Sequence, residues 1–178
     1  MDFPFLIGEK GYLRPVEMED VDRFVRWFND PEVRTTISST IPMSHLRERE
    51  FVEKLYKDNR DVVLAVVAKE GDVHIGVAGL HGIGMPNRNA TFGIAIGEKT
   101  YWDKGYGTEA TKLMLNYGFG TLALHRIMLL VYDFNPRGIH VYEKLGFKEE
   151  GRKRESVFRG GKFQDEILMG ILESEWKG

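Results

Sequence analysis

The sequence contains no cysteine, which excludes a disulfide framework, a thiolate zinc site, an iron–sulfur centre and a cysteine nucleophile. It also lacks an excess of one charge: 25 Lys and Arg against 27 Asp and Glu give a net charge of -2, so we expect neither a nucleic-acid nor a membrane partner. No apolar run approaches the ~20 residues of a membrane span, and the start, Met1-Asp2-Phe3-Pro4-Phe5, lacks the pattern of a signal peptide. These absences together predict a cytoplasmic protein.

Several catalytic and organisational signatures are also missing. The sequence has no G-x-S-x-G and no H-E-x-x-H motif, and its five histidines, at positions 45, 74, 81, 125 and 140, show no metal-ligand spacing. We therefore expect no metal site and interpret the histidines as surface or packing residues. No repeat, low-complexity tract or linker marks a boundary, so residues 1–178 are predicted to form a single domain.

The hydrophobic pattern alternates between strand and helix periodicity. In the first part it predicts a strand near Tyr12–Arg14 and a helix through Val21–Phe28 that ends near Asn29-Asp30-Pro31. A polar loop at 35–40 then leads to a second helix, which is capped by Ser44 and carries Phe51, Val52, Leu55 and Tyr56. Three strands follow, at 62–68, 74–80 and 91–96. In the second part it predicts a helix at 108–120, a strand at 127–131, a helix at 136–145, and two strands, with Val157-Phe158 before and 163–172 after a turn at 159–162. The economical architecture is an α/β fold with a mixed sheet and helices on its faces.

A glycine-containing segment precedes one of these helices. Gly105-Tyr106-Gly107-Thr108 follows Tyr101-Trp102-Asp103-Lys104 and leads into the predicted helix. Free amides at a helix N-terminus, next to glycines that allow close approach, favour a phosphate or pyrophosphate site. A lone Gly-x-Gly is weak evidence, because a flexible turn before a helix has the same sequence.

A second segment runs from Asn135 to Phe147. Asn135-Pro136 is typical of a helix cap followed by a proline in the first turn, and Gly146 of a left-handed helix end. Positions 135, 138 and 142 share one helical stripe, so an amide, a missing side chain and a phenol face one neighbour. Glycine inside a helix costs about 1 kcal/mol relative to alanine, which indicates close packing at Gly138. From this helix alone, Tyr142 is equally well explained as a core aromatic.

With both segments in view, the sequence resembles the GNAT superfamily of acetyl-CoA-dependent N-acetyltransferases, and within it the group typified by the ribosomal-protein alanine N-acetyltransferases RimJ and RimL and by spermidine N-acetyltransferase. The likeness runs from Leu13-Arg14-Pro15 to Met169-Gly170-Ile171-Leu172 and is most specific at 101–110 and 135–147. It implies the GNAT fold: a central, mostly antiparallel sheet that splays between its fourth and fifth strands, which end near Ile96 and Tyr132, flanked by about four helices.

The same resemblance implies roles for individual residues. Acetyl-CoA, as donor substrate, would be bound by Ile94, Ala95, Ile96, Trp102, Asp103, Lys104, Gly105, Tyr106, Gly107, Thr108, Asn135, Arg137 and Gly138. The backbone of Ile94 and Ile96 would bond the pantetheine arm, the amides of 104–108 would hold the pyrophosphate, and Asn135 would contact the pantetheine. Tyr142 would act as the general acid, so Tyr142 and Asn135 are the expected catalytic residues. Two positions depart from the superfamily pattern: Trp102 replaces the usual Gln or Arg, and Gly138 stands where relatives often carry alanine.

The chemistry of acetyl transfer fits these parts. A backbone N–H near Ile94 or Ala95 would polarise the thioester carbonyl, and Tyr142 would protonate the leaving thiolate. The base is open: Glu98 and Asp133 end strands beside the expected groove, but a charged strand end is more often simply solvated. An α-amine with a pKa near 8 needs no strong base.

The acceptor is the least determined part. The 35–40 loop carries Thr and Ser, and position 91 is Thr, where polyamine-using relatives carry carboxylates. We therefore expect a protein N-terminus or a small amine-bearing molecule as acceptor, acetylated by direct attack in a ternary complex. Trp27, Phe28 and Tyr132 are expected groove walls, each also explicable as core.

Three other functions stay open at this point. They are a polyamine acetyltransferase, a non-catalytic acetyl-CoA-binding sensor, and, remotely, an NAD-dependent oxidoreductase, since Gly105 to Ala110 also fits G-x-G-x-x-A. The long loop from 97 to 104 and the preceding hairpin strands argue against the last. A homodimer is compatible with the sequence.

Overall fold

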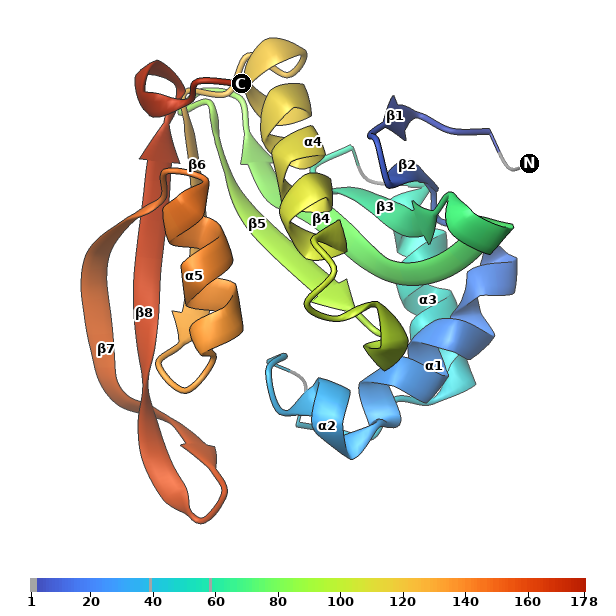
Figure 1. The fold of residues 1–178 in the computed structure, drawn as a ribbon. Coiled ribbons are helices and arrows are strands. Elements are labelled where there is room, and N and C mark those ends of the chain that lie inside the picture. The colour runs from blue at the N-terminus through green and yellow to red at the C-terminus, as the bar shows by residue number, and fades with distance from the viewer. Residues whose placement is uncertain (1–2, 39, 58) are drawn as a thin grey trace.

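The computed structural model describes residues 3–38, 40–57 and 59–178, so Met1, Asp2 and Ser39 of the expected 35–40 loop lie outside the described residues. An eight-stranded sheet organises them in the order β1-β2-β3-β4-β5-β6-β8-β7 (Figure 1). The strands are β1 (Leu6–Ile7), β2 (Gly11–Pro15), β3 (Val62–Ala68), β4 (Val73–Gly84), β5 (Asn89–Ile96), β6 (Arg126–Tyr132), β7 (Lys148–Arg159) and β8 (Lys162–Leu172).

Five α-helices flank this sheet within the described residues: α1 (Val21–Asn29), α2 (Pro31–Arg34), α3 (His45–Leu55), α4 (Tyr106–Gly120) and α5 (Pro136–Lys144). Helices α4 and α5 lie on one face of the sheet, with α1 and α3 on the other (Figure 1). Met114 and Leu115 of α4 pack into the larger core, whereas Phe24 and Val52 belong to a smaller core between α1, α3 and the sheet. The predicted mixed sheet with helices on both faces is confirmed.

The sheet is antiparallel at every pairing except between β5 and β6. Those two strands run parallel and pair only from Asn89–Arg126 to Thr91–Met128. Beyond Thr91 they separate, which confirms the predicted splay. The added short strand β1 makes them the fifth and sixth strands rather than the fourth and fifth.

Helix ends follow the local signals closely. The Ser44 hydroxyl accepts a hydrogen bond from the Arg47 amide and begins α3, as predicted. The Asn29-Asp30-Pro31 segment ends α1 but also begins α2, because the Asp30 carboxylate accepts the amides of Glu32 and Val33. The predicted loop at 35–40 therefore follows a short additional helix, α2, rather than following α1 directly.

Strand β7 is far longer than the predicted Val157-Phe158 pair. It begins at Lys148 and pairs with β8 along most of its length, with register shifts near Gly151 and before Val157. Its side chains are mostly exposed and charged, so it lacks the apolar alternation of a half-buried strand. The turn at Gly160 and Gly161, both at positive φ, is as predicted. No helix in the described part of the chain is long and apolar enough to cross a membrane.

Candidate functional site

The gap between β5 and β6 exposes part of the β5 backbone. The Gly97 amide donates to the Ile75 carbonyl on the β4 side. Because successive residues of a strand direct their backbone groups to opposite sides, those of Ile96 and Ile94 point toward the gap. The Ala95 amide points toward β4, so of the two amides expected to polarise a carbonyl only that of Ile94 faces the gap.

Trp102 braces the loop that leads from β5 to α4. Its indole N–H donates to the Ile96 carbonyl at 2.7 Å. The Arg137 guanidinium lies 5.3 Å from the Trp102 ring centroid and pairs with Asp103 at 3.0 Å. Trp102 therefore links β5, the loop and α5 through the Ile96 carbonyl, which is one of the backbone groups that we expected to bond the pantetheine arm.

The first turn of α4 is built to leave its amides accessible. Asp103 (φ 58°) and Gly105 (φ 86°) adopt the left-handed conformation and turn the chain into the helix. The first amides of a helix have no partner within it, and the dipole there favours anions. A Cβ at Gly107 would meet only Ile96 Cγ1, at 3.8 Å, so the protein itself does not require glycine there. The glycine instead leaves open space beside the first turn of α4.

Glu109 holds this turn in place, a role that we did not predict from the sequence. Its carboxylate accepts the backbone amides of Glu9, Lys10 and Gly11 at 2.7–3.1 Å, which ties the β1–β2 turn to α4. A glutamate in the first turn of a helix is common on solvated surfaces, so its sequence position carried no signal.

A cavity of about 610 Å³ lies between α4, α5 and the end of β5. Twelve of the predicted residues line it: Ile94, Ala95, Ile96, Trp102, Asp103, Gly105, Gly107, Thr108, Asn135, Arg137, Gly138 and Tyr142. Two do not. Lys104 lies over the Tyr101 ring at 5.6 Å, and Tyr106 is buried edge-to-face against the same ring. We call this space the donor cavity.

Asn135 begins α5 as predicted. Its side-chain oxygen accepts the Gly138 amide at 3.1 Å. A Cβ at Gly138 would lie 2.8 Å from Asn135 Nδ2 and 3.3 Å from Val131 Cγ2. The close packing that Gly138 indicated is therefore provided, at least in part, by the side chain of the capping residue, Asn135.

A second cavity of about 630 Å³ opens on the α1 and α3 face of the sheet. Ile37, Ile94, Ala95 and Tyr142 line both cavities, so the two spaces meet where β5 leaves β6. Tyr142 is 8% exposed and packs against Phe92 and Phe147. Burial raises the pKa of its phenol to about 12, which keeps the hydroxyl protonated at neutral pH.

Comparison with known proteins identifies this arrangement. The family model of the acetyltransferase (GNAT) domain matches residues 12–148. The chain belongs to the GNAT acetyltransferase family. The chain is 30% identical over 176 residues to the uncharacterised N-acetyltransferase p20 of Bacillus licheniformis (97% of this chain, 98% of that protein) and 31% identical over 178 residues to the spermidine N(1)-acetyltransferase of Escherichia coli strain K12 (92% and 87%). A crystal structure of the Vibrio cholerae spermidine N-acetyltransferase in complex with CoA and spermine superposes with a TM-score of 0.88 at 30% identity (94% and 98%).

As an N-acetyltransferase, the protein uses acetyl-CoA as donor, and the oxidoreductase alternative is wrong. The second space, here called the acceptor cavity, is lined mainly by apolar side chains, among them Phe24, Phe28, Phe51 and Leu130. Phe28 and Tyr132 line it as expected. Trp27 does not: it is 3% exposed and packs on His74 and Phe24, so the prediction of a groove wall was wrong there.

Glu48 is the most unusual group in this acetyltransferase's acceptor cavity. It is 2% exposed, it lines the cavity from α3, and its Oε1 has no hydrogen-bond partner in the described structure. Burial raises the pKa of this carboxyl to about 7. A signal was present in the sequence, because Glu48 precedes the apolar residues Phe51, Val52 and Leu55 by three, four and seven positions.

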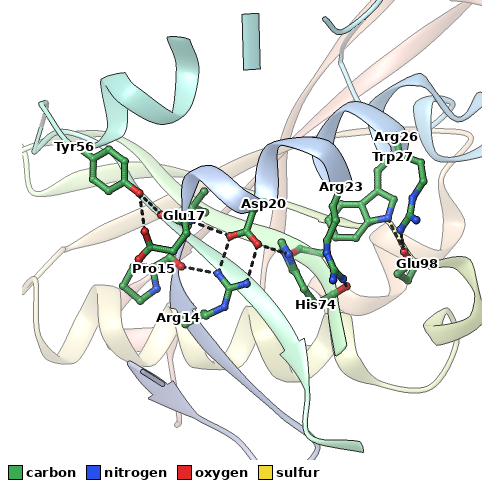
Figure 2. A network of polar contacts seen from close by, with 12 residues as sticks. Arg14, Pro15, Glu17, Asp20, Arg23, Arg26, Trp27, Tyr56, His74 and Glu98 are labelled. Carbon is green, nitrogen blue, oxygen red and sulfur yellow. Dashed lines mark hydrogen bonds and ion pairs between the residues drawn. The ribbon is translucent and has the colours of Figure 1, made fainter. Parts of the chain in front are cut away.

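The two predicted base candidates lie outside both cavities. The Glu98 carboxylate pairs with Arg26 and accepts the Trp27 indole N–H at 3.0 Å (Figure 2). Asp133 lies 4.0 Å from Arg152, and its buried Oδ1 has no hydrogen-bond partner in the part of the chain that the structure describes. Neither lines the donor or the acceptor cavity. Within the described residues, no group of three or more His, Asp or Glu could hold a metal ion.

A buried polar network supports the α1 wall of the acceptor cavity. Asp20 accepts two hydrogen bonds from Arg14, at 2.7 and 2.8 Å, and lies 2.9 Å from His74 Nδ1 (Figure 2). His74 Nε2 lies 2.9 Å from the Gly76 carbonyl, so both ring nitrogens face oxygen acceptors. Burial disfavours the charged carboxylate, but the bonds from Arg14 and His74 outweigh it and hold the pKa of Asp20 well below its usual range. The network fixes the start of α1 to β2 and β4.

Proposed function

We propose that the protein transfers the acetyl group of acetyl-CoA directly to a primary amine in a ternary complex, with a peptide or protein N-terminus or a small monoamine as acceptor. The observation that carries this proposal is the meeting of the donor and acceptor cavities at Tyr142, Ile94 and Ala95. Each substrate then has its own space, and the two contact each other only at the point of transfer.

The residues of the donor cavity fit acetyl-CoA, which supplies the thioester when bound. The amides at the start of α4 would hold the pyrophosphate, and the backbone of Ile94 would bond the pantetheine arm and polarise the carbonyl. Asn135 would position the arm through the part of its amide that the helix cap leaves accessible. Tyr142 would donate its phenolic proton to the departing thiolate.

The acceptor cavity supports a single cationic group on an apolar body. Glu48 offers a buried carboxyl whose Oε1 has no hydrogen-bond partner among the described residues, whereas Glu166, which also lines the cavity, already pairs with Lys153 at 2.8 Å. Thr91 and Ile37 line the cavity with no charge. A polycation would place additional ammonium groups against aromatic and aliphatic side chains, which is unfavourable without paired carboxylates.

A polyamine is the second candidate acceptor. It is favoured by the likeness to spermidine N-acetyltransferases and by the two carboxylates, Glu48 and Glu166, that the sequence did not reveal as cavity residues. The two candidates differ in the number of charges that the acceptor carries, and this difference can be measured.

A panel of amines tests the proposal. Purified protein and acetyl-CoA would be mixed with spermidine, 2-phenylethylamine and a free-N-terminus peptide amide, and released CoA thiol would be followed with a disulfide reagent. The protein has no cysteine, so it contributes no thiol background. We expect the highest kcat/KM with the peptide or the monoamine. A large preference for spermidine would establish the polyamine alternative, and acetyl-CoA binding without turnover on any amine would favour the sensor.

A further inference from the structure

The acceptor cavity has a gap in its floor. Residues Val77, Gly79 and His81 of β4 share one face of the sheet and stand opposite Ala95, Gly93 and Thr91 of β5, and all six line the acceptor cavity. The central pair is Gly79–Gly93, so no side chain rises from the sheet there. The gap lies one residue from Ile94, whose amide faces the donor cavity opening.

The His81 imidazole lies over this glycine pair. A Cβ at Gly79 would be 2.9 Å from His81 Nε2, and one at Gly93 would be 3.7 Å from the same nitrogen. The ring therefore folds back along β4 toward the point where the two cavities meet. Its side chain is 39% exposed, so a ligand can reach it.

Asp61 orients the ring from the other side. Its Oδ2 lies 3.6 Å from His81 Nδ1, while its Oδ1 accepts the Gly82 amide at 2.8 Å. The carboxylate is thus held by the backbone and faces Nδ1, which leaves Nε2 directed at the glycine gap. A carboxylate behind an imidazole favours the ring orientation in which Nδ1 faces the anion and Nε2 faces the cavity.

We propose that His81, oriented by Asp61, is the base that removes the proton from the acceptor amine. The proposal rests on the proposed function and adds the group that Glu98 and Asp133 do not supply. The amine nitrogen forms a bond to the acetyl carbon while the bond from that carbon to sulfur breaks. His81 Nε2 takes the proton that nitrogen loses, the Tyr142 hydroxyl gives its proton to the thiolate, and exchange with water restores both side chains.

Other ionisable groups face the same cavity and set the electrostatic surroundings of His81. They are Arg47 and Glu48 from α3, Tyr132 from β6, Tyr142 from α5 and Glu166 from β8, with Asp61 nearest. Lys153 neutralises Glu166, Tyr142 stays protonated at neutral pH, and burial disfavours the charged form of Glu48, so Asp61 is the carboxylate placed to act on the imidazole.

The test measures kcat against pH at saturating acceptor, using the best amine of the panel described above. We expect His81→Gln to lower kcat by about 10- to 100-fold and to remove the acidic limb of the profile, with acetyl-CoA affinity unchanged within about twofold. Asp61→Asn keeps the ring but removes the carboxylate that orients it, so it should lower kcat less than His81→Gln does and leave acetyl-CoA affinity unchanged within about twofold. The matched control is His45→Gln, which disrupts another His–carboxylate pair, with Asp22 at 3.2 Å, outside both cavities.

The outcomes distinguish a failure of this proposal from a failure of the proposed acetyl transfer on which it rests. Wild-type kcat and an intact acidic limb in folded His81→Gln would overturn the base assignment and leave acetyl transfer standing. A higher KM with unchanged kcat would overturn it too, because it would make His81 a binding residue only. If His81→Gln fails to fold, Asp61→Asn decides, because wild-type kcat in that variant would overturn the base assignment. No turnover of any amine would remove the proposed function and this proposal with it.

Discussion

Replacing Glu48 with Gln should change how the stability of the protein depends on pH. Burial raises the pKa of Glu48 from 4.5 to about 7, so folding favours the protonated form. The sign follows: the stabilisation is present at low pH and is lost as the pH rises toward the folded-state pKa. A shift of this size corresponds to about 3 kcal/mol in full, of which about 2 kcal/mol falls between pH 5 and pH 7.5 by the same linkage.

Urea unfolding at pH 5 and pH 7.5 measures the effect. The free energy of unfolding of Glu48→Gln minus that of the wild type should be about 2 kcal/mol larger at pH 7.5 than at pH 5. This difference of differences cancels every other titrating group and any fixed cost of burying the amide. Glu50→Gln, on the exposed side of the same helix, is the control and should show no such change. Parallel pH dependences for wild type and Glu48→Gln would refute the burial of an unpaired carboxyl in the acceptor cavity.

Three further variants test other parts of the account. Gly107→Glu should weaken CoA binding by at least about 100-fold in calorimetry, since it adds charge and bulk at the phosphate site. Gly107→Ala, whose Cβ the protein can accommodate, should lose much less affinity. Wild-type CoA affinity in a folded Gly107→Glu protein would contradict the phosphate site. Asp20→Asn should lower the free energy of unfolding by about 3 kcal/mol at pH 7, with the loss shrinking below about pH 4, where Asp20 of the unfolded wild-type chain takes up a proton; an unchanged urea midpoint at pH 7 would disprove the network. Trp102→Phe removes the bond to Ile96 and should raise KM for acetyl-CoA with little effect on kcat, whereas a large fall in kcat alone would assign Trp102 a different role.

Local signals determined much of the fold. Ser44 and Asn135 cap the helices that they precede, and the apolar strand at 62–68 lies inside the sheet between β2 and β4. The helix α2 and the length of β7 were not predicted, and each omission has a physical reason. Pro31 both ends one helix and begins the next, and β7 lies at the sheet edge with its side chains in solvent, where no hydrophobic alternation is needed.

In the candidate site, the donor cavity could be predicted from the sequence and most of the acceptor cavity could not. The donor cavity comes from two continuous segments, 101–110 and 135–147, so its residues could be read in order along the chain. The acceptor cavity depends on strand register: His81 meets the Gly79–Gly93 gap only because β4 and β5 pair as they do. No spacing within the sequence contains that information. Glu48 lay within reach of prediction, but a glutamate on a helix is usually solvated.

The proton donor at the junction of the two cavities is the central claim, and Tyr142→Phe tests it most directly. The phenylalanine ring keeps the packing against Phe92 and Phe147 and removes only the hydroxyl. With the best acceptor of the amine panel, kcat should fall by about 10- to 1000-fold while the Kd for acetyl-CoA stays within about twofold. Wild-type kcat in this variant would contradict the account and leave Tyr142 as a core residue.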